Sequence, residues 1–316
     1  MPKTLKFAML GMIAGNGHPY SWSAIVNGFD PVAMAPCPYP TIPKYLGARP
    51  LETVKVPYAQ VTHVWTDNPA EAPLVAKASL IPNVMDKPED AIGQVDAVFV
   101  ATDNGFDHVR RARPFVEAGL PVFVDKPLAT SLEELQTFID WKKAGARILS
   151  SSSGRYAPEL DPWFADKSSL GDIRWLSCVT TKYWENYGVH ALEPVFKLLG
   201  PGFVSVRLDG RPKFEVAHLF HKCGAQVTLS VIYDAGGGGL YMNGTKGCVT
   251  VQIGDAYTQF RRQIVTFIDY VRSGGPDPYP FSETIEIQAI LIAALRSRAE
   301  GNRRVDVAEV MNDLKL

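Results

Sequence analysis

The first half of the chain alternates short β-type runs with helical runs, and this alternation constrains the fold more than any other feature. Strand-like runs cover residues 6–10, 60–66, 97–101 and 122–124. Helical spacing fills the intervals between them, as it does over 108–119. A repeating order of strand and helix predicts a parallel sheet with crossover helices. We therefore expect a doubly wound α/β domain in this half.

A further helix is marked by its N-terminal cap. Thr130 or Ser131 precedes the helical run, and Glu133 and Glu134 follow three residues on. This is the pattern of a capping box, in which side chains satisfy the free backbone N–H groups of the first turn. The helix is expected to lead into one more strand, at 147–150.

From about residue 151 the pattern changes to strand-like segments separated by turns. The expected strands are 173–181, 203–208, 215–221, 225–234 and 240–253. Such a series is typical of a large, mostly antiparallel sheet. Two helices, expected at 263–271 and 283–298, close the chain, and they are predicted to pack back on the first half.

A proline-rich segment interrupts the first half. Seven prolines lie between residues 31 and 57, with little periodicity, where a simple α/β domain would pass directly to its second strand. We interpret residues 31–59 as an insertion. It is a solvated surface loop, a wall of the substrate site or an oligomer contact.

The composition excludes several classes of partner. The chain has 316 residues, a formal net charge of −1 and no basic run, which argues against nucleic acid and anionic membranes. No apolar stretch approaches the length of about 20 residues that a membrane-spanning helix needs. The four cysteines are scattered and form no C-x-x-C pair, so no zinc site or disulfide framework is indicated. We expect a cytoplasmic protein that binds a small molecule.

A glycine-rich turn follows the first expected strand. It contains Gly11, Gly15 and Gly17 and leads into a helix. Glycines at such a place let backbone N–H groups approach a pyrophosphate at the helix N-terminus. The spacing differs from G-x-G-x-x-G, so an ordinary flexible loop is the alternative.

The second expected strand ends at Asp67. A carboxylate at this place can accept hydrogen bonds from the adenosine ribose diol of NAD, and it would repel the extra phosphate of NADP. No arginine stands beside Asp67 in the sequence to offset that repulsion. NAD is therefore expected rather than NADP, and a helix cap over Asn68 and Pro69 is the alternative role for this aspartate.

The most informative stretch begins at the end of the third strand. It reads Ala101-Thr102-Asp103-Asn104, followed by His108, and the next strand ends in Asp125-Lys126-Pro127. This order resembles the Gfo/Idh/MocA oxidoreductases, whose corresponding motifs are A-T-P-N, a histidine and E-K-P. Asp103 in place of proline and Asp125 in place of glutamate are departures from those motifs.

The resemblance implies a fold, a cofactor and a set of residues. It implies a Rossmann-type domain over 1–125, an α+β domain over 126–316, and an open sheet that joins homodimers or homotetramers. The residues it places at NAD are Thr102, Asn104, His108, Asp125 and Lys126. Lys126 would reach between nicotinamide and substrate and stabilise the developing alkoxide. The resemblance also implies a cis peptide before Pro127.

A second signature resembles the family's D-x-G-x-H-x-x-D stretch. It runs from Asn186 through Gly188 and His190 to Glu193. His190 is the candidate general base, since its ordinary pKa near 6.5 suits proton exchange around neutrality. Asn186 replaces an aspartate and cannot carry a charge, so Glu185 or Glu193 would have to supply an anionic partner. Otherwise Lys126 and His190 share the acid–base work.

Aromatic and polar residues near this signature are candidates for substrate binding. Tyr183, Trp184 and Asn186 lie around it, and Arg155 occupies a position where the family often has a substrate-facing arginine. Aromatic faces beside hydrogen-bonding groups suit a carbohydrate, although aromatic residues also fill domain interfaces. His18, directly after the glycine turn, either reaches the nicotinamide or substrate or packs at the helix start.

The sequence therefore predicts an NAD-dependent oxidoreductase acting on a secondary alcohol of a sugar, cyclitol or related polyol. One alternative is a glycoside-cleaving enzyme that retains NAD and works by transient oxidation and elimination. The second alternative, motivated by Asn186, is a regulatory protein that binds NAD without catalysis.

Overall fold

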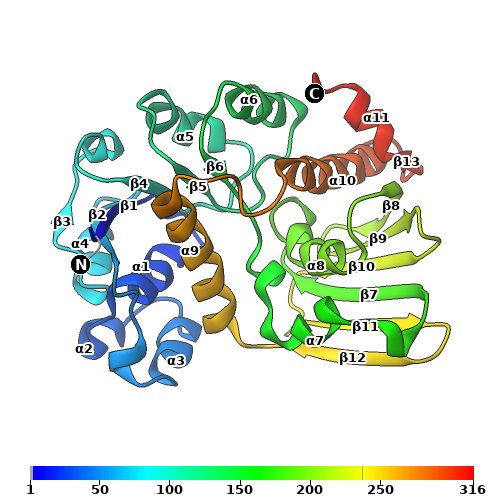
Figure 1. Cartoon of the computed structure of the whole chain (residues 1–316), viewed down its shortest axis with the longest axis horizontal. Helices are drawn as coiled ribbons and strands as arrows, with labels where there is room; N and C mark the ends of the chain where they lie inside the picture. The colour runs from blue at the N-terminus through cyan, green and yellow to red at the C-terminus, as the bar shows by residue number, and fades with distance from the viewer. Residues whose placement is uncertain (1–2, 237) are drawn as a thin grey trace.

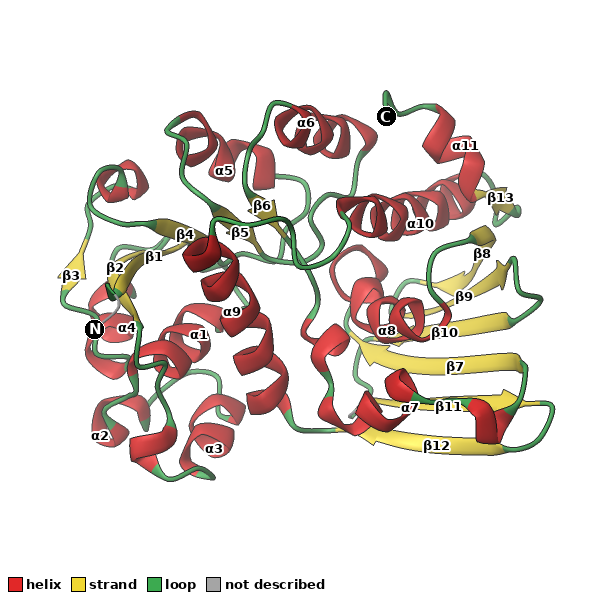
Figure 2. Cartoon of the chain, viewed as in Figure 1, coloured by secondary structure: helices red, strands yellow, loops and turns green. Residues whose placement is uncertain are grey.

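The computed structural model describes residues 3–236 and 238–316 and divides the molecule into two halves, each built on its own sheet (Figure 1, Figure 2). The first sheet has six parallel strands in the order β3-β2-β1-β4-β5-β6. Its strands are β1 (Leu5–Leu10), β2 (Ala59–Trp65), β3 (Asn83–Val84), β4 (Ala97–Val100), β5 (Val122–Val124) and β6 (Ile148–Leu149). This order is that of the dinucleotide-binding Rossmann fold, so the predicted fold class of the first domain is confirmed.

Helices connect the strands of this first sheet as crossovers. Ser131 caps the last of them, with its hydroxyl accepting the N–H of Glu134 at 3.2 Å. The connecting helices are α1 (His18–Asn27), α4 (Ala72–Ala78), α5 (His108–Glu117) and α6 (Leu132–Lys143). Because all strands run the same way, their carboxyl ends and the helix N-termini meet along one edge.

The second sheet has seven strands in the order β12-β11-β7-β10-β9-β8-β13. All neighbouring pairs are antiparallel except β7 and β10, so the prediction of a mostly antiparallel sheet is confirmed. Its strands are β7 (Ile173–Thr181), β8 (Phe203–Arg211), β9 (Phe214–His221), β10 (Gln226–Ile232), β11 (Gly238–Gly244), β12 (Cys248–Ile253) and β13 (Val305–Asp306).

Helices cover one face of this second sheet. Both α8 (Trp184–Leu199) and α10 (Phe281–Ala299) pack on it, and their buried side chains form one core with the inward residues of the strands. The smaller elements of this half are α7 (Asp161–Ala165), α11 (Val307–Asn312) and the 3₁₀ turns Ser153–Tyr156, Pro158–Leu160 and Ser168–Leu170.

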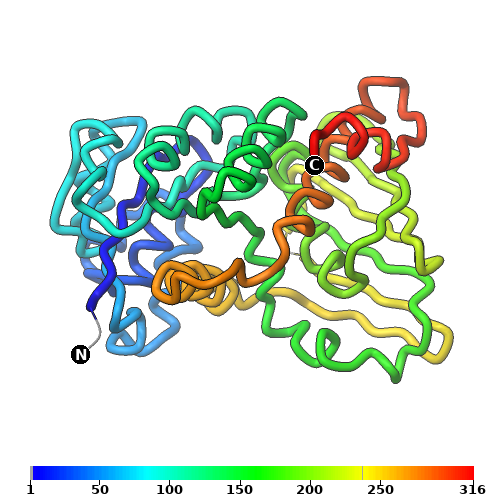
Figure 3. Tube along the Cα trace, turned by 45° about the horizontal axis from the view of Figure 1, so that its top comes forward, coloured from blue at the N-terminus to red at the C-terminus, as the bar shows by residue number. Residues whose placement is uncertain are grey.

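The helix α9 (Ala256–Ser273) follows strands β7 to β12 in sequence but packs on the first domain (Figure 3). Phe267 lies in an aromatic cluster with Phe7, Phe99 and Phe123, with ring centroids 6.1, 5.0 and 5.5 Å away. The chain therefore leaves the first domain, builds most of the second, returns to complete the core of the first, and then adds α10, β13 and α11 to the second.

Two regions differ from the sequence expectations. The insertion is not an irregular loop, since it contains α2 (Pro31–Met34), α3 (Thr41–Gly47) and a 3₁₀ turn (Leu51–Thr53). Met34, Ile42 and Leu46 of this segment are buried in the core of the first domain. The single strand expected over 240–253 is two antiparallel strands, β11 and β12, joined by a turn.

Candidate active site

The glycine turn fits a phosphate-bearing cofactor at Gly11. This residue has a φ of +88°, and a Cβ there would lie 2.7 Å from Thr102 Cγ2. Gly15 also has a positive φ, of +82°. Gly17 serves a different purpose, because a Cβ there would lie 2.5 Å from the ring of Tyr39 in the insertion. Only part of the expected turn is therefore free to approach a ligand.

Asp67 lies directly beside this turn. Its Oδ2 accepts the backbone N–H of Met12 at 3.0 Å. Contrary to the expectation from sequence, an arginine does stand beside it: Arg111 of α5 donates to Oδ1 at 2.8 Å and to Oδ2 at 3.2 Å. The sequence did not reveal this pair because the two residues are 44 positions apart and are brought together only by the fold.

A cleft of about 390 Å³ opens between the two domains. It is lined by Ile13 and Ala14 of the glycine turn, by Asp103 to Phe106 after β4, by Thr130, and by Tyr183, Glu185 and Asn186 at the start of α8. Within the described residues, Thr102 Oγ1 and Asn186 Oδ1 are buried without hydrogen-bond partners. Asn186 lines the cleft and Thr102 directly precedes its wall at Asp103. A cleft at the carboxyl edge of a Rossmann sheet, with polar atoms left free beside it, fits a dinucleotide.

Two residues expected at the cofactor have different surroundings. Asn104 lines the cleft, and its side chain accepts the N–H of Phe106 at 3.2 Å. His108 is fully buried and bridges two backbone carbonyls, that of Thr102 at 2.7 Å and that of Leu128 at 3.2 Å. Its structural role is to hold the turn after β4 against the turn after β5.

Lys126 is a buried cation, with 2% of its surface exposed. Its ammonium donates to the carbonyl oxygen of Asn186 at 3.0 Å and lies 3.4 Å from Asp103 Oδ2. It also lies 4.1 Å from the centre of the Tyr187 ring. The peptide bond between Lys126 and Pro127 is cis, as the resemblance implies. These contacts place the ammonium against the start of α8, and the carboxylate of Asp103 balances its charge.

Asp125 is also buried, and it is fully hydrogen-bonded. Its Oδ1 accepts the N–H of Lys126 at 2.7 Å, and its Oδ2 accepts the Asn16 amide at 3.1 Å and lies 2.5 Å from His18 Nδ1. Burial alone would raise the pKa of Asp125, but His18 and Lys126 together hold that pKa below its ordinary value. The carboxylate therefore remains anionic.

His190 lies one turn beyond Asn186 on α8. Its Nδ1 is 2.7 Å from Ser152 Oγ, and its ring packs edge-on against Tyr187. Burial lowers the pKa of His190 well below 6.5, and the neighbouring basic side chains Lys126, His18 and Lys182 lower it further. The imidazole is consequently neutral at pH 7.

Neither glutamate in the second signature partners His190 among the described residues. Glu185 pairs with Arg298, and Glu193 pairs with Arg155 at 2.7 Å and accepts the N–H of Ser152 at 3.1 Å. The partner of His190 is thus the Ser152 hydroxyl rather than a carboxylate, while Glu193 fixes the backbone that carries that hydroxyl.

The proposed substrate residues fall into two groups. Tyr183 and Asn186 line the cleft. Trp184 is fully buried and donates its indole N–H to the carbonyl of Leu291 at 3.3 Å, so it anchors α8 to α10. Arg155 is also buried, held by Glu193 and by Glu283 at 2.9 Å, and it does not line the cleft. Neither side chain lines the cleft as expected, because Trp184 is packed between helices and Arg155 is held by its ion pairs.

Several residues of the site were not among those expected from sequence. Asp103 pairs with Lys126, Ser152 with His190, and Lys182 donates to the carbonyl of Gly15 at 2.9 Å. Tyr187 lies between the ammonium groups of Lys126 and Lys182. The helical spacing of Tyr187 and His190 placed them on one face and was a usable signal. The contacts of Ser152 and Lys182 join residues that are far apart in the sequence, so no sequence signal pointed to them.

The fold and this cleft define a two-domain oxidoreductase of the Rossmann type. Residues 42–152 match the model of the GFO_IDH_MocA family, described as an oxidoreductase family with an NAD-binding Rossmann fold. Residues 42–152 are thus similar to this family, and the resemblance predicted from the motifs is confirmed over this segment. The predictions of an oxidoreductase and of NAD as its cofactor are confirmed by the same match. No curated protein sequence matches the chain.

Solved structures share the architecture of the whole chain. A probable dehydrogenase from Thermotoga maritima is 16% identical, with a TM-score of 0.75 over 97% of this chain and 100% of that one. A putative myo-inositol dehydrogenase from Sinorhizobium meliloti 1021 is 18% identical, with a TM-score of 0.73 over 96% and 100%. GenD2 from gentamicin A biosynthesis, solved with NAD, is 19% identical, with a TM-score of 0.75 over 97% of each chain. At these identities the likeness concerns the fold.

Across residues 3–236 and 238–316, no helix has the length and hydropathy that crossing a bilayer requires.

Proposed function

We propose that this oxidoreductase oxidises a secondary alcohol of a sugar, cyclitol or related polyol and uses NAD as the oxidant. The observation that carries the proposal is the buried ammonium of Lys126, which is held by Asp103 and Asn186, two residues that line the cleft. A fixed cation at the mouth of a nucleotide site is suited to stabilise negative charge on a hydroxyl oxygen. The myo-inositol and scyllo-inositol dehydrogenases named among the similar structures support a cyclitol within this substrate class.

In this proposal, each residue of the cleft has a separate task. Lys126 polarises the reacting hydroxyl, while Tyr183 and Asn186 hold the other hydroxyls of the polyol. His190 receives a hydrogen bond from the reacting hydroxyl through its free ring nitrogen, because Ser152 occupies Nδ1. Asp67 and the turn at Gly11 hold the adenosine end of the cofactor. NAD, when bound, supplies the acceptor for the hydrogen and electron pair that carbon loses.

The test is NADH formation at 340 nm with the purified protein, NAD and a panel of monosaccharides, cyclitols and glycosides. Stoichiometric NADH with one of these compounds, lost in Lys126→Ala, is the expected result. Release of an aglycone from a glycoside without net NADH would replace the proposal with the elimination reaction. NAD binding with neither activity, across the whole panel, would favour a protein that binds NAD without catalysis.

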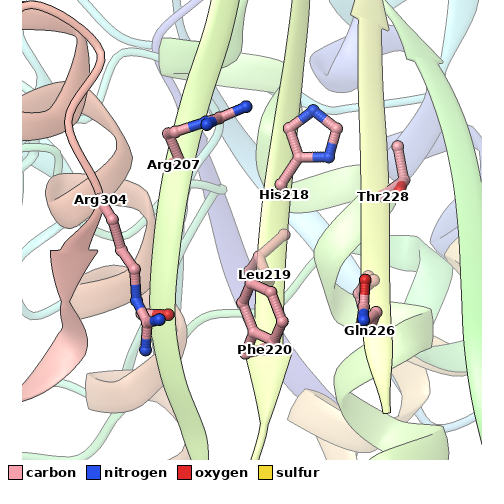
Figure 4. A pocket seen from close by; sticks show the side chains of 9 residues that line it. Arg207, His218, Leu219, Phe220, Gln226, Thr228 and Arg304 are labelled. Carbon is pink, nitrogen blue, oxygen red and sulfur yellow. The ribbon is translucent and has the colours of Figure 1, made fainter.

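The outer face of the second sheet is proposed to join subunits into a homodimer or homotetramer. Trp175 and Phe220 flank Gln226 across three neighbouring strands, and both aromatic side chains are about 40% exposed. A shallow pocket of about 250 Å³ on the same face is lined by polar side chains such as His218 and Thr228 (Figure 4). A broad face that mixes aromatic and polar residues and is covered by no helix suits a second copy of the chain.

We also infer a cytoplasmic location. All four cysteines are free in the structure, and two of them, Cys223 and Cys248, are exposed. Exposed thiols persist in a reducing compartment.

A further inference from the structure

His18 is fixed by its neighbours at the first turn of α1. Its ring stacks on Trp22 with centroids 4.4 Å apart and meets the edge of Phe260 at 5.3 Å. Its Nδ1 lies 2.5 Å from Asp125 Oδ2. The ring thus has an apolar platform on one side and a carboxylate at one nitrogen, which together determine its orientation.

Asp125 is ionised, so it accepts a hydrogen bond from His18 and cannot donate one. The Asn16 amide and the N–H of Lys126 occupy other lone pairs of the carboxylate. Because this anion faces Nδ1, the ring carries its proton on Nδ1 and leaves Nε2 unprotonated when His18 is neutral. A buried aspartate that fixes a histidine in this way is the arrangement used by hydrolytic triads to prepare a proton acceptor.

The second ring nitrogen of His18 is available to a ligand. Nε2 makes no hydrogen bond to the described residues, and 16% of the side-chain surface is exposed. His18 and Lys126 both act on Asp125 after β5 and on His190 of α8, while Trp22 of α1 and Phe260 of α9 are the aromatic rings that pack on His18. His18 therefore shares one electrostatic environment with the two residues expected to meet the substrate.

His190 is less suited to keep a proton. It has a hydroxyl partner instead of a carboxylate, and burial and the neighbouring basic side chains hold its pKa well below 6.5. His18, in contrast, has the only carboxylate that contacts a histidine at this site among the described residues. The geometry of a histidine that faces a buried carboxylate, as His18 does, is the one suited to proton transfer.

We propose that His18 and Asp125 form an acid–base dyad that takes up the proton of the reacting hydroxyl, a role that rests on the proposed alcohol oxidation. The O–H bond breaks and its proton moves to Nε2 of His18, while the C–H bond breaks and its hydrogen and electron pair pass to NAD. A C=O bond forms between the same two atoms. Asp125 stays ionised and stabilises the imidazolium, and His190 remains a neutral hydrogen-bond acceptor.

The kinetic test uses His18→Gln and Asp125→Asn with NAD and whichever of myo-inositol, scyllo-inositol and D-glucose yields NADH with the wild type. His18→Gln is expected to lower kcat/KM by about 100- to 1000-fold, the usual contribution of a general base. Asp125→Asn removes the anion that stabilises the imidazolium. Its kcat/KM should therefore fall as well, although the side chain keeps its shape.

Affinity for NADH, measured by fluorescence titration, separates this role from cofactor binding. The NADH dissociation constant of His18→Gln should stay within about threefold of the wild-type value. His63→Gln, a histidine change on β2, should alter neither kcat/KM nor this dissociation constant. A rise in the NADH dissociation constant that matches the loss in kcat/KM would show that His18 anchors the cofactor and would overturn the dyad. If Lys126→Ala is inactive but His18→Gln is not, the dyad fails while the proposed function stands.

A measurement on the wild type needs no substrate. In ¹⁵N-histidine NMR at pH 8, the dyad requires a protonated Nδ1 and an unprotonated Nε2 for the resonance that disappears in His18→Gln. The Nδ1 proton should be strongly downfield and should shift in Asp125→Asn. The opposite tautomer would overturn the proposal whatever the kinetics show.

Discussion

At the end of β2, the pair of Asp67 and Arg111 combines a group that favours NAD with one that could bind a phosphate. Arg111 is bound to Asp67 through both terminal nitrogens and to Asp107 through Nε, at 2.8 Å. While Asp67 is present, the guanidinium is occupied and the carboxylate repels a phosphate on the ribose. The preference for NAD therefore depends on one carboxylate.

Asp67→Ser should raise the use of NADP relative to NAD. The change removes the repulsion and frees Arg111 for the 2′-phosphate, so the ratio of kcat/KM for NADP to that for NAD should rise by about tenfold, roughly 1.4 kcal/mol. Initial rates with each cofactor measure this ratio. On the same background, Arg111→Ala should cancel the gain, and an unchanged ratio would mean that Asp67 does not face the ribose.

His190 should make the stability of the protein depend on pH. The unfolded chain protonates this histidine near pH 6.5, whereas the folded chain, in which burial and nearby cations lower the pKa of His190, does so only at lower pH. The unfolded state thus binds more protons below about pH 6.5, and stability is lost as the pH falls through this window. Thermal unfolding from pH 7.5 to pH 5 should show a smaller loss of Tm in His190→Gln than in the wild type. His63 and His221 titrate in both proteins, so the difference isolates His190.

The positions of the candidate site residues could be predicted from the sequence where these residues follow strands of the first sheet. Elsewhere their positions were harder to predict. Asp67, Asn104 and Lys126 come directly after β2, β4 and β5, and the carboxyl ends of parallel strands meet at one edge. The pairing of His190 with Ser152, and the burial of Arg155 by two glutamates, depend on how loops and helices of the second domain pack. Local sequence carries little information about such long-range contacts.

Among the elements, strands were predicted more closely than the insertion. Strand β7 has the expected bounds, and β1, β4 and β5 agree within one residue. Strands β4 and β5 are fully buried apolar runs and β1 is buried over its last four residues, whereas β7 alternates buried and partly exposed residues near its middle. Helices α2 and α3 have only 4 and 7 residues, too few to show a helical period. Their stability comes from packing on α1, α4 and α9, which the sequence of the segment does not display.

The insertion supports the glycine turn, and Gly17 tests that support. Gly17→Ala should destabilise the protein by about 1–3 kcal/mol and weaken NAD binding, because the new methyl group would overlap the ring of Tyr39 and displace α3. Urea unfolding and NADH fluorescence give the two quantities. Gly47→Ala, in the same helix α3, meets no atom within 4 Å and should be neutral or stabilise by up to about 1 kcal/mol. If both changes had equal effects on stability and on NADH binding, the insertion would not support the glycine turn through Gly17.

At the scale of the whole molecule, the outer face of the second sheet determines the expected assembly. Trp175→Glu should convert the proposed dimer or tetramer to monomers, since a charge would have to be buried in the middle of the interface. Light scattering after size-exclusion chromatography measures the mass. Leu74→Glu, at a residue of α4 that is 59% exposed, is the matched control and should leave the mass unchanged. An assembly that survives Trp175→Glu would place the interface elsewhere.

The return of α9 to the first domain also bears on how the chain is made. The aromatic side chains Phe7, Phe99 and Phe123 emerge early from a ribosome, but Phe267, which covers them, belongs to a helix that ends only at Ser273. The domain that is synthesised first is therefore completed only after strands β7 to β12 of the second sheet have emerged. During that interval an aromatic surface faces water, which is the kind of surface that aggregates or is bound by chaperones.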